Sequence, residues 1–114
     1  MKKLEAIIKS DKVSEVVAAV MEAGAKGVTV TDVKGQGSAA RPMIRSGRGT
    51  SQLRAEYNKM ESIMTIVEDS EVDTIASAIA NAAYTGKNGD GIIVVNDVAK
   101  VINIASKKTD ESAL

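Results

Sequence analysis

Two parts of this chain repeat one order of patterns, in which a strand is followed by a helix and then by another strand. The first part spans residues 3–35 and the second spans residues 62–97, and "SEVVAAVMEAGAKGVTV" is echoed by "SEVDTIASAIANAAYTGKNGDGIIVV". Two β-α-β units of this size predict a single α+β domain over residues 1–114. We expect a ferredoxin-like βαββαβ fold, with an antiparallel four-stranded sheet and both helices on one face.

The first unit contains clear signals for each of its elements. Residues 3–9, "KLEAIIK", alternate and end in an apolar pair, which is typical of a half-buried strand. Ser10 or Asp11 is the expected helix cap, and Gly24 or Gly27 is the expected helix end. Alternation resumes in "GVTVTDVKG", which predicts the second strand over residues 27–35.

The second unit follows the same order. A strand is predicted over residues 62–68, and Ser70 is the expected cap of the next helix, with Asp73 completing a loose capping box. Gly86 is expected to end that helix. Residues 91–97, "GIIVVND", are apolar on both faces and predict a central strand. Residues 100–106 are a candidate short final strand, followed by a polar tail.

The second face of the predicted sheet needs a cover. We expect it to carry Thr29, Thr31 and Thr65 beside apolar neighbours. The chain has no Phe, no Trp and two Tyr, so its core must be built from aliphatic side chains. A domain of this size that leaves one sheet face in water is marginal, and we therefore expect an oligomer.

Composition excludes several classes of function. Without histidine or cysteine the chain lacks the usual general base, thiol nucleophile and zinc ligands, so we expect neither an enzyme nor a metal site. The net charge is zero, and Tyr57 and Tyr84 fall outside the predicted strands, which argues against a nucleic-acid-binding sheet. The N-terminus resembles neither a signal peptide nor a membrane span, so a cytoplasmic protein without membrane insertion is expected.

A long basic segment separates the two units. Residues 36–60 read as a loop, since residues 34–49 are a poor strand with glycines at 35, 37, 47 and 49 and the loop has no acid before Glu56. Loops of this length in compact domains are usually functional or disordered. Because guanidinium groups suit carboxylates and phosphates, Arg41, Arg45 and Arg48 are the candidate partner-binding residues. The alternative is a disordered linker.

A second glycine-rich segment, "TGKNGDG" at residues 85–91, joins the predicted second helix to the strand after it. Glycines allow positive φ, and successive backbone amides in such a turn can cradle a phosphate. The alternative is a helix C-cap followed by an ordinary turn. The spacing does not match a Walker A loop.

These segments resemble the PII signal-transduction family. Residues 1–37, ending in "GVTVTDVKGQG", and residues 82–95, "AAYTGKNGDGIIVV", carry the resemblance at the expected separation. It implies a homotrimer that binds an adenine nucleotide, ADP or ATP, between subunits. Residues 36–60 would be the T-loop that contacts a target protein, residues 85–91 the B-loop and residues 103–114 the C-terminal tail. The implied nucleotide-binding residues are Gly27, Val28 and Thr29 from one subunit, with Gly35, Gly37, Lys87, Gly89, Asp90 and Gly91 from its neighbour.

The chain also departs from the family pattern at charged positions. Ile92 follows "GDG" where the family usually has a lysine, and Asn103 and Ala105 replace two phosphate-binding arginines. Ser38 and Ala39 replace an Arg-Gln pair whose glutamine helps to hold magnesium and 2-oxoglutarate. We therefore expect weak nucleotide binding, and neither metal nor 2-oxoglutarate.

The sequence thus favours a PII-like regulator, of a family associated with nitrogen regulation, that senses a small anionic ligand and controls a partner through residues 36–60. Partners of the family include membrane transporters and metabolic enzymes. The alternative is a PII-like binding module that has lost nucleotide sensing and binds its partner constitutively or under another ligand.

Overall fold

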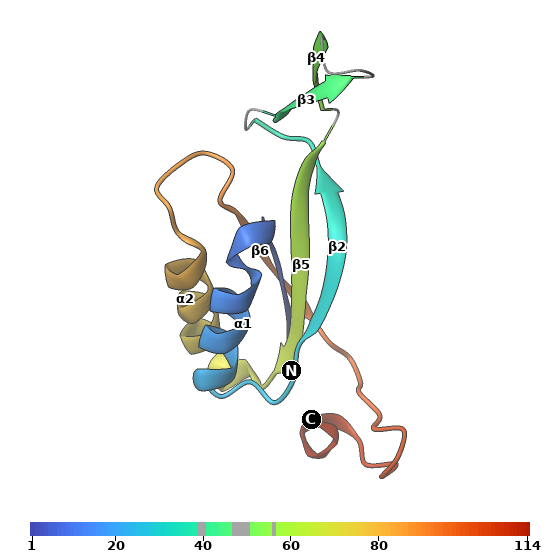
Figure 1. The fold of residues 1–114 in the computed structure, drawn as a ribbon. Coiled ribbons are helices and arrows are strands. Elements are labelled where there is room, and N and C mark those ends of the chain that lie inside the picture. The colour runs from blue at the N-terminus through green and yellow to red at the C-terminus, as the bar shows by residue number, and fades with distance from the viewer. Residues whose placement is uncertain (39–40, 47–50, 56) are drawn as a thin grey trace.

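The fold is a four-stranded antiparallel sheet with two helices on one face, which confirms the predicted ferredoxin-like α+β class. The computed structural model describes residues 1–38, 41–46, 51–55 and 57–114. The strand order in the main sheet is β2-β5-β1-β6 (Figure 1). The elements of the main fold are β1 (Lys2–Lys9), η1 (Ser10–Lys12), α1 (Val13–Glu22), β2 (Thr29–Gly35), β5 (Asn58–Val67), η2 (Asp69–Glu71), α2 (Val72–Ala83) and β6 (Gly91–Asp97).

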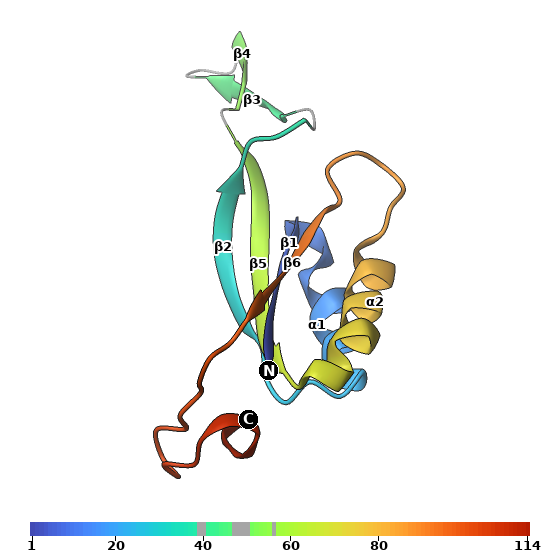
Figure 2. The same cartoon turned by 180° about the vertical axis from the view of Figure 1, so that it is seen from behind.

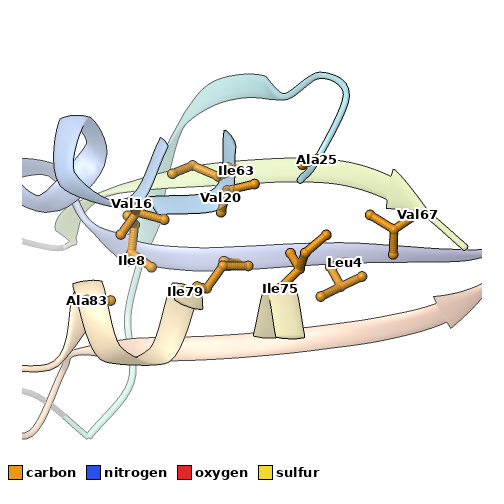
Figure 3. Packing of buried hydrophobic residues seen from close by; sticks show 11 residues of the cluster. Leu4, Ile8, Val16, Val20, Ala25, Ile63, Val67, Ile75, Ile79 and Ala83 are labelled. Carbon is orange, nitrogen blue, oxygen red and sulfur yellow. The ribbon is translucent and has the colours of Figure 1, made fainter. Parts of the chain in front are cut away.

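The core lies between the sheet and the two helices, and it is aliphatic. Every second residue of β1 from Leu4 to Ile8 is buried, as the period of a strand requires. The helices meet this row with residues one turn apart, which share a helix face. Figure 3 shows Val16 and Val20 of α1 and Ile75 and Ile79 of α2 gathered over the row; all four are at most 1% exposed.

Short 3₁₀ turns, rather than the predicted caps, introduce both helices. Ser10 and Asp11 lie inside η1, and no side chain caps α1. Helix α1 ends at Glu22, and Gly24 follows with a φ of +109°, as predicted for a terminating glycine. Helix α2 ends at Ala83, three residues before the predicted Gly86, because Tyr84 already has extended backbone.

A pair of glutamates, not the predicted Ser70 and Asp73, forms the capping box before α2. The side chains of Glu68 and Glu71 each bond the backbone of the other across η2. The Glu68 amide donates to Glu71 Oε1 at 3.2 Å. Acidic side chains therefore have structural roles at this helix start, where the helix dipole favours them.

The strand β6 lies at an edge of the sheet, so its prediction as a central strand was wrong. It pairs with β1 alone, and Ile92 and Val95 are 61% and 45% exposed. The apolar run reflects two different environments. Ile93 packs against the core on the helix side, while Ile92 lies on the opposite, open face of the sheet.

The open face carries fewer threonines than expected. Thr29 and Thr31 lie on it, opposite Met64 and Ser62 in the register. Thr65 lies instead on the helix side, because it is opposite the buried Leu4, and it is 2% exposed. The alternation in the sequence did not determine which residues of β5 lie on the same face of the sheet as Thr29 and Thr31.

The chain beyond the main sheet corrects two further expectations. Residues 36–60 were predicted to be a loop, but they contain β3 (Met43–Ser46) and β4 (Ser51–Arg54), which pair as a small antiparallel sheet past the ends of β2 and β5. Strand β5 begins at Asn58, earlier than the predicted residue 62. The Cα radius of gyration is 17.0 Å, against about 13 Å for a compact domain of this length.

The tail after β6 contains no strand within residues 98–114, against the prediction for residues 100–106. An isolated bridge joins Ile102 to Thr109, and the chain ends in the 3₁₀ helix η3 (Asp110–Ala113). Figure 2 shows the tail leaving the sheet at the end opposite to residues 85–91. The turn of residues 85–91 and the C-terminal tail therefore lie at opposite ends of β6.

Position 91 of the sheet requires a glycine. It has a φ of +115°, and a Cβ at this position would lie 1.9 Å from the carbonyl oxygen of Ile7. We predict that Gly91→Ala lowers the free energy of unfolding by at least about 2 kcal/mol, through backbone strain and the clash with β1. Urea denaturation measures the change.

Gly37→Ala is the matched control for this substitution. A Cβ at Gly37 meets nothing within 4 Å, so the urea midpoint should stay close to that of the wild type. Equal stability of the two variants would show that β6 is not held against β1 as described.

Candidate functional site

The predicted nucleotide-binding residues lie in two groups at opposite ends of β2. Residues 27–29 are at its start, while Gly35 and Gly37 are at or beyond its end, near residues 85–91. A strand rises about 3.3 Å per residue, so the seven residues of β2 separate the groups by roughly 20 Å. One chain therefore holds the predicted residues in two separate groups, called half-sites below, and the resemblance likewise implied residues from two subunits.

The first half-site is a hollow of about 230 Å³ beside the start of β2. All three residues predicted here line it, and its apolar wall comes from Val28, Met64 and Ile66. The Thr65 hydroxyl donates a 2.7 Å hydrogen bond to the Gly27 carbonyl and so fixes the backbone at one edge. This Gly27–Thr29 hollow, as we call it, is lined by Lys26, Gly27, Val28, Thr29, Met64, Thr65, Ile66 and Leu114.

The second half-site is the turn of residues 85–91, which is closed around the carboxylate of Asp90. Its Oδ2 accepts hydrogen bonds from the amides of Thr85 at 2.7 Å and Gly86 at 3.1 Å. The Thr85 hydroxyl donates to Oδ1. Gly86 and Gly89 have φ values of +82° and +97°, which the turn needs and which L side chains rarely adopt. The Asp90 side chain therefore holds the turn.

Strand β1 anchors this turn through an ion pair. Lys9 Nζ lies 3.1 Å from Asp90 Oδ1 and 3.4 Å from the Thr85 hydroxyl. Hydrogen bonds from Thr85, first from its side chain and then from its backbone, hold the pKa of Asp90 well below its usual range. Lys9 and the Gly86 amide lower it further, while partial burial opposes them. Sequence reasoning missed Lys9, which is 81 positions from Asp90, because no local pattern marks so distant a contact.

A polar contact joins the 85–91 turn to the segment after β2. The Ser38 hydroxyl lies 3.3 Å from Asn88 Oδ1 and 3.2 Å from Asn88 Nδ2. Gly35 at the end of β2 has close packing, because a Cβ there would lie 3.4 Å from the Met60 side chain. Lys87 is exposed, and its amide donates to the Thr85 hydroxyl at 3.3 Å. The turn and the base of the 36–60 segment are thus in direct contact.

Ile92 and Asn103, which stand where the family usually has cationic residues, have no phosphate-binding role in this structure that their contacts would indicate: one lies on the open sheet face and the other is bonded within the tail. Ile92 is 61% exposed on the open sheet face. Asn103 organises the tail: its Oδ1 accepts from the amides of Ala105 and Ser106 at 3.0 Å, and its Nδ2 donates to the Ala113 carbonyl at 3.3 Å. The asparagine therefore has a structural role in the tail.

The candidate partner-binding arginines are described only in part. Arg41 precedes β3 and has interactions of its own within the chain. Arg45 lies in β3, with its backbone opposite Gln52. Arg48 lies outside the described residues. The structure therefore places Arg45 on a short paired strand, where the sequence had predicted a loop.

A carboxylate pair that the sequence analysis did not single out lies on the two strands, β2 and β5, that flank residues 36–60. Asp32 and Glu61 are directly opposite each other on β2 and β5. A hydrogen bond with Asp32, together with desolvation, raises the pKa of Glu61 above its usual value. Among the described residues no group of three or more acidic side chains could hold a metal ion.

An aspartate has an ordinary pKa of about 3.9. We predict that Asp90 remains ionised well below pH 4. Since its pKa is lowered in the folded state, its stabilising contribution is present above about pH 4 and is lost as the pH falls toward the folded pKa. The carboxyl ¹³C shift of Asp90, measured by NMR from pH 6 down to pH 2, should therefore keep its ionised value well below pH 4, and a full titration with a midpoint near pH 4 would contradict the prediction.

Two variants separate the causes of this shift. Thr85→Val removes the hydroxyl that contributes most, and Lys9→Met removes the ion pair. The pKa of Asp90 should rise more in Thr85→Val than in Lys9→Met. The reverse order would mean that charge, rather than hydrogen bonding, closes the turn.

Comparison with known proteins identifies the family of the chain. The sequence model of the family described as "Nitrogen regulatory protein P-II" matches residues 1–108. The chain is 40% identical over 114 residues to nitrogen regulatory protein P-II 1 of Escherichia coli K12, with all of both chains covered. It is 34% identical over 114 residues to nitrogen regulatory protein GlnK2 of Haloferax mediterranei, covering all of this chain and 91% of that protein. The protein belongs to the P-II family of nitrogen regulatory proteins.

Proposed function

We propose that this protein is a P-II regulator that binds an adenine nucleotide and controls a target protein through residues 36–60. The observation that carries the proposal is the pair of half-sites: an apolar hollow at the start of β2 and a glycine turn beyond its end. The hollow suits a flat apolar base, and the turn suits a phosphate. No helix within the described residues is long and apolar enough to cross a bilayer.

The nucleotide site is complete only when subunits meet, and the open sheet face supports such an assembly. Ile92 is 61% exposed on it, and the half-buried Ile7, Met64 and Ile66 lie on the same face. Contiguous apolar surface on a sheet favours association. A homotrimer would place the Gly27–Thr29 hollow of one subunit beside the 85–91 turn of its neighbour.

Phosphate binding at the turn rests on few donors. The amides of Thr85 and Gly86 already serve Asp90. The amides of Asn88 and Gly89, with the Lys87 ammonium, are the donors that we assign to phosphate. Because Ile92, Asn103 and Ala105 offer no positive charge, the affinity should be low, and it should depend on Lys87.

We predict that ADP and ATP bind weakly, with three sites per trimer, and that neither magnesium nor 2-oxoglutarate strengthens binding. Lys87→Met should weaken binding about 10- to 100-fold, since hydrogen bonds to charged groups contribute about 1.5–3 kcal/mol. Calorimetry measures the affinity, on samples whose trimeric mass is checked by sedimentation.

Lys100→Met is the control, since Lys100 lies beyond the opposite end of β6 from the turn. It should bind ADP as the wild type does. Tight, magnesium-dependent ATP binding that 2-oxoglutarate strengthens would contradict the proposed site. A stable monomer at micromolar concentration would contradict the assembly.

The second candidate function is a P-II binding module without nucleotide sensing. The replacement of three family cations by Ile92, Asn103 and Ala105 favours it. The absence of measurable heat with any adenine nucleotide, together with capture of a target protein, would support this alternative.

We assign partner contact to Arg41, Arg45 and Arg48. The segment that carries them extends past the main sheet, where a target can reach it (Figure 1). The family's association with membrane transporters and metabolic enzymes gives the classes of target to test first. An acidic surface is the expected complement.

We predict that replacing all three arginines with alanine abolishes capture of the partner from lysate and leaves the melting temperature almost unchanged. Replacing all three with lysine keeps the charge but removes the planar fork, and it should weaken capture less. Pull-downs at rising salt test the charge dependence. Early unfolding of the alanine variant would show that the segment is packed structure, and undiminished capture by it would place recognition elsewhere.

A further inference from the structure

Two acidic side chains face each other close to the point where the 36–60 segment leaves the sheet. Asp32 of β2 is directly opposite Glu61 of β5, and the pairing of the two strands ends soon afterwards, at Gly35 and Asn58. Directly opposite residues of an antiparallel pair are in contact, and like charges in these positions repel. We propose that Asp32 and Glu61 share one proton as a latch, which holds the ends of β2 and β5 together and loosens them when the proton is lost.

The surroundings of Glu61 favour its protonated carboxyl. Toward β1, Glu61 is opposite Ile8, whose side chain is 2% exposed. Glu61 Oε2 is shielded from water, and it has no hydrogen-bond partner among the described residues. An ionised oxygen in such a position loses its hydration without compensation, whereas a neutral carboxyl can donate its proton to Asp32. The hydrogen bond with Asp32 and partial burial accordingly raise the pKa of Glu61.

Two lysines continue the same face of the strands toward the segment. Lys34 and Lys59 are directly opposite each other, next after the acidic pair on this face, and both are exposed. Lys59 lowers the pKa of Glu61, but the hydrogen bond and the burial that raise it have larger effects. Lys9 of β1 lies 3.1 Å from Asp90 instead. The lysines therefore moderate the repulsion between the carboxylates without removing it.

The helices η1 and α1 pack against β5 on the face that carries Glu61. Their charged residues are Asp11, Lys12, Glu15 and Glu22. The ammonium of Lys12 lies 3.4 Å from Glu15 Oε2 and is thus already paired. Among the side chains that the structure describes, no ion pair includes Asp32 or Glu61. A shared proton is therefore the means by which the described structure relieves the repulsion within the pair.

Loss of the shared proton weakens the pairing where the segment is attached. Two like-charge pairs, one acidic and one basic, then follow each other at the ends of β2 and β5, and each of them destabilises the strand pair. The 36–60 segment continues from these two strand ends beyond the main sheet (Figure 1). Elements with weak pairing open locally. The protonated latch therefore restricts the movement of the segment, and the deprotonated latch releases it.

The direction of the response to pH follows from the raised pKa of Glu61. The stabilising contribution of the protonated pair is complete below the ordinary glutamate pKa of about 4.3 and is lost as the pH rises through the higher folded pKa. Asp69 and Asp90 have lowered pKa values, so their contributions are lost in the opposite direction, as the pH falls. Because global stability mixes these effects, the latch requires a measurement at its own residues.

The first test is an NMR titration of the wild type, which needs neither nucleotide nor partner, so its failure would leave the proposed function untouched. The carboxyl ¹³C shift of Glu61 should titrate above about pH 4.3. The amide shifts of β3 and β4 should change with the same midpoint. Amide protection at residues 33–35 and 58–60, corrected for intrinsic exchange, should fall about 2- to 5-fold as the pH rises through it. A Glu61 midpoint at or below the ordinary value would overturn the shared proton, and segment shifts that do not follow this midpoint would overturn the latch.

Variants of similar shape give the second test. Glu61→Gln keeps a donor to Asp32 without a titrating group, so the segment shifts should stay at the low-pH values of the wild type. Asp32→Asn removes the negative charge, so the pKa of Glu61 should fall and the pH response of the segment should disappear. Glu5→Gln is the matched control, because Glu5 is a half-buried glutamate that accepts a 2.8 Å hydrogen bond from Ser62, and it should keep the wild-type response. Persistence of the response in Glu61→Gln, or its loss in Glu5→Gln, would overturn the proposal.

Discussion

The strand β1 is the element on which the other parts of the structure depend. It is paired on both sides, and its Leu4, Ala6 and Ile8 form the floor of the core. Met1, the residue before this strand, ties down two more segments: the N-terminal ammonium lies 2.8 Å from Asp69, and the Met1 carbonyl accepts from the Val98 amide at 3.2 Å. The last residue of β1, Lys9, holds the 85–91 turn. One strand therefore positions the core, the start of α2, the tail and the candidate phosphate site.

The sequence predicted the fold because both β-α-β units carry strong periodicity and because their order admits few arrangements. It predicted less about which side each strand faces. The apolar run of β6 did not distinguish a central strand from an edge strand, and the phase of Thr65 depends on pairing between strands. Glu68, two residues before Ser70, forms the capping box with Glu71 across η2, so the predicted Ser70 is not the cap. These choices depend on tertiary contacts that local patterns do not encode.

The candidate site shows the same division. Gly89 and Gly91 were found because a turn that needs positive φ leaves a mark in the sequence, whereas Gly27 was implied only by the family resemblance. Lys9 and Leu114 were missed because they reach the half-sites from opposite ends of the chain. Asn103 was read only as the loss of a phosphate contact. The structure shows that its side chain makes three hydrogen bonds within the tail, so the change of residue also brought a structural gain.

Coupling between the proposed nucleotide site and residues 36–60 needs more than the contact seen between Ser38 and Asn88. That contact is exposed, and a hydrogen bond of this kind contributes about 1 kcal/mol. Moving a segment from about 1% to about 99% of one state requires about 5.5 kcal/mol of differential binding. Loss of the contact when a ligand binds the turn would therefore change the equilibrium constant between two states of the segment by only about fivefold. A complete switch requires the ligand itself to contact the segment in one of its states, and with Ser38 and Ala39 in place of the family's Arg-Gln pair this chain offers little for such a contact. A graded response of residues 36–60 is the behaviour that these energies support.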